Sequence, residues 1–120
     1  MKCINLTLWI CTLLLLSACK NQGKFEITNS TGKLVDSFYI MPDKRSGNNF
    51  IKLNPGEKSL YKTDMSNESS DGTFMLHYKT KSGGRFSDFG YYTNGAFLEK
   101  IIRIDIQPDT VLFKFEYSKY

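Results

Sequence analysis

The stretch Ile101-Ile102-Arg103-Ile104-Asp105-Ile106, followed by Val111-Leu112-Phe113-Lys114-Phe115-Glu116-Tyr117, decides the fold of this 120-residue chain. In both runs every second residue is apolar, and most of the residues between them are polar or charged. This period of two places the apolar side chains on one face of a β-strand. Residues 107–110 between the runs are rich in turn formers. The two runs therefore predict amphipathic strands, each with one buried face.

Shorter alternating runs, separated by turn residues, extend the pattern back to Phe25, and none has a helical period. In one of them, Leu34, Phe38 and Ile40 are expected to share the buried face, with Asp36 as a polar exception. The runs amount to seven or eight strands, with turn signals every 8–12 residues or so. The sequence therefore predicts an all-β fold, an antiparallel β-sandwich of immunoglobulin-like or transthyretin-like type. A small closed barrel is the alternative.

Two turns have specific signatures. Asn54-Pro55-Gly56 places Pro before Gly, which favours a type II turn because Gly accepts a positive φ. Asn94-Gly95 favours a two-residue type I′ hairpin between residues 91–93 and 96–98, because both residues tolerate a positive φ.

The N-terminal segment has the order of an export signal. Lys2 provides a positive start, an apolar run covers residues 4–16, and the small residues Ser17 and Ala18 follow. Leu16-Ser17-Ala18-Cys19 resembles the lipobox of bacterial lipoproteins. The resemblance implies a helical signal peptide at 1–18, cleavage before Cys19, and lipid on the sulfur of Cys19. It also implies a lipidated N-terminus and short tether at 19–24, which leaves a β-sandwich domain at 25–120.

The same resemblance indicates a location. Lys20 is not the Asp that retains such lipoproteins at the inner membrane, so we expect a lipid-anchored protein of the outer membrane, facing the periplasm rather than the cell surface. The other two cysteines, Cys3 and Cys11, lie in the segment that would be removed. No pair is then left for a disulfide, and the domain has to be held by its core.

Residues with catalytic chemistry are scarce. His77 is the single histidine, and its place opposite Phe74 and Leu76 predicts an exposed strand residue. A Ser or Cys nucleophile needs a base within reach, and zinc needs three or four ligands. We expect no enzyme, no cofactor and no metal site, although the oxygen-rich loop Asp64–Asp71 leaves calcium binding open.

Residues 85–97 contain the best candidate binding site. Tyr91 and Tyr92 are successive residues of a strand, so at least one ring is expected to be exposed near the hairpin tip. Tyrosine is enriched at binding hot spots. The candidate binding residues are Tyr91, Tyr92, Asn94, Arg85 and Phe97, with Asp88 as a neighbour.

The charge balance gives no sign of nucleic-acid binding. Loss of residues 1–18 would leave 15 basic and 12 acidic residues, a small and dispersed excess. We therefore predict a membrane-anchored, non-catalytic binding or structural module whose partner is an envelope protein or glycan. An immunity or inhibitor protein against a toxin or wall-degrading enzyme is the alternative, and a secretion-system lipoprotein is a third.

Overall fold

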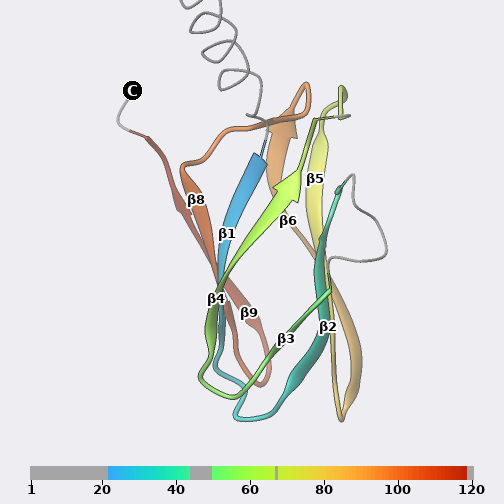
Figure 1. Ribbon diagram of the computed structural model, residues 1–120, viewed down its shortest axis with the longest axis vertical. Helices are drawn as coiled ribbons and strands as arrows, with labels where there is room; N and C mark the ends of the chain where they lie inside the picture. Colours follow the sequence, from blue (N-terminus) through green and yellow to red (C-terminus); the bar gives the residue numbers. More distant parts are fainter. Residues whose placement is uncertain (1–21, 44–49, 67, 119–120) are drawn as a thin grey trace, which may run out of the picture.

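A computed structural model describes residues 22–43, 50–66 and 68–118. This part of the chain forms nine strands arranged in two sheets that pack face to face (Figure 1). The predicted all-β sandwich is confirmed. In chain order the strands are β1 (Gln22–Asn29), β2 (Val35–Met41), β3 (Ile51–Leu53), β4 (Lys58–Asp64), β5 (Gly72–Thr80), β6 (Gly83–Thr93), β7 (Ala96–Phe97), β8 (Ile101–Ile106) and β9 (Val111–Glu116).

One sheet has the strand order β4-β1-β8-β9 and the other β3-β2-β5-β6-β7. Two features differ from the sequence prediction: the described residues form nine strands rather than seven or eight, and β1 and β8 pair in parallel, with Phe25 opposite Ile102. Local hairpin signals predict antiparallel neighbours only. Because β1 and β8 are far apart in the chain, no turn between them fixes their relative direction.

The core lies between the two sheets and is built around aromatic rings. Phe25 of β1 contacts Phe74 of β5 at 5.3 Å between ring centroids in an edge-to-face geometry, which joins the centres of the two sheets. Phe89 of β6 stacks on Phe113 of β9 at 4.7 Å. Among the described residues, the fully buried apolar side chains are Phe25, Ile27, Val35, Phe38, Ile40, Leu53, Met65, Phe74, Leu76, Ile102, Ile104 and Ile106.

A bulge in β2 changes which residues point inward. Ser37 has a positive φ of 52°, and the pairing with both neighbouring strands shifts register at this point. An extra residue in a strand lets two inward residues lie three positions apart. Val35 and Phe38 are therefore buried, whereas Leu34, expected inside, is exposed and Asp36 leaves the core face.

A second bulge lies in β6 at Gly90, where φ is 66°. A Cβ at this position would lie 3.3 Å from Phe74 and 3.4 Å from Phe115. Phe89 and Gly90 thus both face the core, and Tyr92 also points inward, three positions after Phe89. Glycine is required here both by φ and by the space available.

Both predicted turns have the expected backbone. Glu57 donates its backbone N–H to the carbonyl of Asn54 at 2.9 Å, and Gly56 has a φ of 79°. Asn94 and Gly95 have φ values of 52° and 71°, as a type I′ turn requires.

Residues 1–21 lie outside the described part, so the proposed helical signal peptide (1–18), the lipobox and the first residues of the tether lie outside it too. The sheet begins at Gln22, before the expected domain start at Phe25. Within the described ranges, no helix has the length and apolar character that crossing a membrane would require.

Candidate functional site

Four rings form a continuous row on the outer face of the five-stranded sheet. Phe50 contacts Tyr39 at 4.9 Å between centroids, Tyr39 contacts His77 at 5.0 Å, and His77 contacts Phe86 at 4.3 Å. The register explains the row, because His77 of β5 lies directly opposite both Tyr39 of β2 and Phe86 of β6. Directly opposed side chains on one face of a sheet are close enough to pack. We call these four residues the aromatic row.

The row belongs to a larger apolar surface. Met41 and Met75 are cross-strand partners two positions from Tyr39 and His77, and so lie on the same outer face. Phe86 is 63% exposed and Phe50 51% exposed. Tyr91, 49% exposed, alternates with the buried Tyr92 and lies on the same outer face, further along β6 beyond the exposed Asp88. The aromatic face is defined by the aromatic row with Met41, Met75 and Tyr91.

His77 is buried, contrary to the sequence prediction of an exposed residue. Its side chain does point to the outer face, as the alternation indicates, but the rings of Tyr39 and Phe86 cover it. Its Nδ1 atom is buried and has no hydrogen-bond partner among the described residues. The row thus contains one buried polar atom that has no partner among the described residues.

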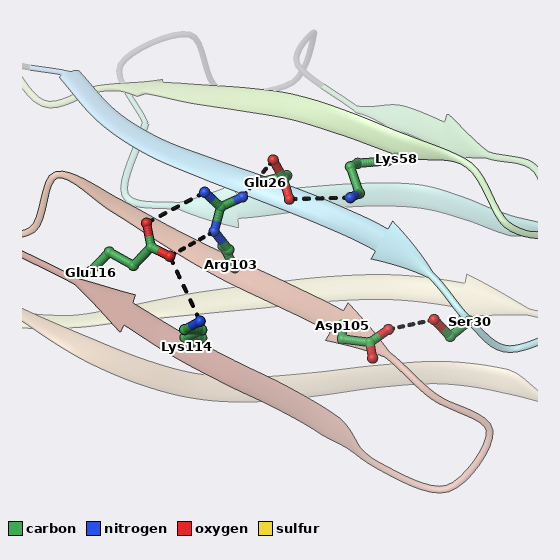
Figure 2. Close-up of polar contacts among 7 residues, drawn as sticks. All are labelled: Glu26, Ser30, Lys58, Arg103, Asp105, Lys114 and Glu116. Atoms are coloured by element: carbon green, nitrogen blue, oxygen red, sulfur yellow. Dashed lines mark hydrogen bonds and ion pairs between the residues drawn. The ribbon is translucent and has the colours of Figure 1, made fainter.

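The outer face of the four-stranded sheet is charged instead (Figure 2). Arg103 of β8 binds Glu26 of β1 at 2.7 Å and Glu116 of β9 at 2.9 Å. Hydrogen bonds from Arg103 lower the pKa of Glu116, and those to Glu116 and Glu26 raise the pKa of Arg103. Arg103, Glu26 and Glu116 thus satisfy one another on this face, whereas the aromatic face exposes rings to water.

Near the hairpin tip the structure separates the two tyrosines as expected. Tyr92 is buried against Phe74 at 5.2 Å between centroids, whereas Tyr91 is exposed. Burial raises the pKa of the Tyr92 hydroxyl, and the charge of Glu68 raises it further. Phe97, another candidate binding residue, packs on Phe25 at 5.3 Å and contributes to the core.

Asn94 lies at the same tip, and its role is tied to the oxygen-rich loop. Its backbone N–H donates to Asp71 Oδ1 at 2.8 Å, and Gly95 donates to the carbonyl of Ser70 at 2.9 Å. A Cβ at Gly95 would overlap the carbonyl of Glu68. In the described residues of this loop, Asp71 thus holds the hairpin. No group of three or more His, Cys, Asp or Glu residues in the described ranges is arranged to hold a metal ion.

Arg85 does not join the other candidate residues. It lies at the start of β6 opposite Tyr78, while Tyr92 lies seven positions further along the same strand. At roughly 3.3 Å per residue, more than 20 Å separates them. Tyr91, Tyr92, Asn94 and Phe97 share one end of the sandwich, and Arg85 lies at the other.

Sequence reasoning did not find the aromatic face. Phe50, Tyr39 and Phe86 come from three separate runs, and only the register brings them together around His77. The sequence gives one local signal of it. Phe38 and Tyr39 are consecutive aromatic residues in a strand, so one of the two rings has to point to the outer face.

No protein-family model matches this chain, and neither a curated protein nor a solved structure matches it. The fold and site define a small β-sandwich with one aromatic and one charged outer face.

Proposed function

We propose that this protein is a lipid-anchored, non-catalytic binding module of the bacterial envelope, and that the aromatic face is its binding surface. The observation that carries the proposal is the exposure of Phe86 and Phe50 at the two ends of a ring row that crosses four neighbouring chain segments. Contiguous exposed apolar surface costs free energy in water, and it is typical of interaction sites.

The composition of the face supports a protein partner. Aromatic residues and Met are enriched in protein interfaces, and exposed Phe is well suited to fill a partner's pocket. Successive rings in the row are inclined by 44°, 39° and 44°. A glycan would stack best on a flat platform of coplanar rings, which this row does not form. We therefore favour an envelope protein over a glycan.

The anchor follows from the lipobox. Lipid on Cys19 would hold the domain close to the bilayer, because few residues separate Cys19 from Gln22 at the start of β1. Several acyl chains on one residue anchor a protein stably. We propose the outer membrane and its periplasmic side as the location. Metabolic labelling with palmitate is expected to mark the natural chain and to miss Cys19→Ser.

The binding proposal is tested with the full-length lipoprotein. Crosslinking in cells, identification of the partner by mass spectrometry, and rebinding of the purified partner should all weaken strongly in Phe86→Ser. The matched control is Leu112→Ser, which removes another exposed apolar side chain, from β9 on the charged face. Equal loss in both variants, or full binding by Phe86→Ser, would contradict the proposed surface. A partner identified as a toxin or wall-degrading enzyme would redefine the module as an inhibitor.

A further inference from the structure

A pocket of about 200 Å³ lies between the two sheets at the end of the sandwich opposite Gln22. The loops at this end are at the bottom of Figure 1. The loop between β1 and β2 contributes Lys33, the β5–β6 hairpin contributes Ser82 and Arg85, and the loop between β8 and β9 contributes Gln107. Tyr78, which is buried, also lines it. This site is separate from the aromatic face.

The pocket lining is basic. Arg85 lies directly opposite Tyr78 in the neighbouring strand, so both side chains are on the inner face of the sheet. The Arg85 side chain therefore lines the pocket between the two sheets. Lys33 lines the same pocket, and the lining contains no Asp or Glu. Neither Arg85 nor Lys33 forms a side-chain ion pair or hydrogen bond with another described residue. Two unpaired cations beside one cavity produce a local positive potential.

Neutral hydrogen-bond donors complete the lining. The Thr80 hydroxyl accepts a hydrogen bond from the Ser82 N–H at 3.2 Å, which leaves its own hydrogen free to donate. The Ser82 hydroxyl is a second donor in the same hairpin. Asp105 bonds to Gln107 beside the pocket, but its two oxygens already accept hydrogen bonds from Ser30 and Gln107.

The loop that carries Lys33 is fixed by a buried asparagine. Asn29 donates from Nδ2 to the carbonyls of Lys33 at 2.7 Å and Leu53 at 2.9 Å. Its Oδ1 accepts from the backbone N–H of Thr31 at 3.0 Å. A fully satisfied buried amide holds a loop in one conformation. Lys33 is therefore attached to a rigid backbone beside the pocket.

We propose that this end pocket binds an oxyanion, a phosphate or carboxylate group, between Arg85 and Lys33. The guanidinium of Arg85 provides a planar fork that matches two oxygens, and Lys33 contributes a point charge. The cavity is smaller than the roughly 300–1,000 Å³ of typical ligand pockets. It therefore fits a single acidic group, free or at the end of a larger molecule, rather than an extended cofactor.

The test uses the full-length lipoprotein in a non-ionic detergent, followed by two-dimensional ¹⁵N NMR. Sodium phosphate and sodium acetate are titrated separately at an ionic strength held constant with sodium chloride. Saturable shifts are expected at the amides of Ser82, Gly83 and Gly84. The stronger of the two anions identifies the group as phosphate or carboxylate.

Arg85→Gln and Lys33→Gln are each expected to weaken the affinity at least tenfold, and Arg85→Lys to retain part of it. Lys24→Gln, an exposed lysine on β1, is the matched control and should bind as the natural chain does. Unchanged resonances elsewhere show that each variant is folded. Shifts that do not saturate, that spread over the surface lysines, or that persist in Arg85→Gln would overturn the proposal. Phe86→Ser should bind the anion normally, which keeps this test separate from that of the aromatic face.

Discussion

The ring of His77 lies 4.3 Å from the ring of Phe86 between centroids, and the two residues face each other across β5 and β6. Their exposures differ widely, at 8% for His77 and 63% for Phe86. Phe86 therefore shields the histidine on one side and leaves most of its own ring in water. Such a side chain contributes little to folding but presents a large apolar contact for a partner.

This difference between binding and folding can be measured directly. Phe86→Ala is expected to lower the free energy of unfolding by less than about 1 kcal/mol, because little apolar surface is returned to water. Phe74→Ala, which empties the centre of the core, should cost about 3–5 kcal/mol. Urea unfolding followed by circular dichroism measures both. A loss in Phe86→Ala as large as that in Phe74→Ala would mean that the aromatic row is a structural element.

Gly90 offers a test of the bulge in β6. Gly90→Ala combines an unfavourable positive φ with crowding against Phe74 and Phe115, and should cost about 2–4 kcal/mol. The matched control is Gly32→Ala, where φ is 77° but no atom lies within 4 Å of the added Cβ. That variant should lose only about 1–2 kcal/mol. Equal losses in the two variants would show that the core does not crowd position 90.

The run at 101–106 was predicted well because its alternation is unbroken from Ile102 to Ile106. Ile102, Ile104 and Ile106 are all buried, and Arg103 and Asp105 face outward. The run at 111–117 is less buried than predicted: Val111 and Phe113 are partly buried, whereas Phe115 and Tyr117 are exposed. Alternation does not predict burial across a bulge. Leu34 and Phe38 are four positions apart, but the bulge at Ser37 leaves Leu34 exposed and Phe38 buried. A positive φ at Ser37 is not readable from a serine in the sequence, because this conformation is uncommon outside glycine and asparagine.

The sequence predicted only those parts of the site that are formed by residues adjacent in the chain. Tyr91 and Tyr92 are neighbours in the chain, so strand geometry alone places them on opposite faces. Proximity in the sequence predicts that Arg85 lies beside them, but the length of β6 places it at the other end of the sandwich. The aromatic row needed the register of β2, β5 and β6, which is fixed by long-range packing rather than by any one segment.

Asn29 should be among the most important polar residues for stability. Asn29→Ala would remove its side-chain hydrogen bonds to Thr31, Lys33 and Leu53 and take a donor from the buried carbonyl of Leu53, at a cost of about 2–4 kcal/mol. The control is Ser66→Ala, at an exposed position in the loop after β4. Thermal and urea unfolding should show a clear loss in the first variant only. A neutral Asn29→Ala would mean that water replaces the amide at this site.

Glu99 should make stability depend on pH. Burial raises the pKa of its carboxyl group above the ordinary value, although its own backbone N–H and the Tyr117 hydroxyl partly oppose this by hydrogen bonding, and its Oε2 atom has no partner among the described residues. A raised pKa in the folded state favours the protonated form. The associated stability is therefore complete below the pKa of the unfolded chain, and it is lost as pH rises through the folded-state pKa.

Glu99→Gln should accordingly be more stable than the natural protein at pH 7, and this advantage should disappear at pH values below the ordinary carboxyl pKa. The lowered pKa of Glu116 acts in the opposite direction, but it is common to both proteins and cancels in the difference. Urea unfolding at a series of pH values measures that difference. Tyr117→Phe removes one of the hydrogen bonds that lower the pKa of Glu99, so it should move the transition to higher pH. If the difference in the free energy of unfolding between Glu99→Gln and the natural chain stays constant from acid to neutral pH, ionisation of Glu99 does not destabilise the fold.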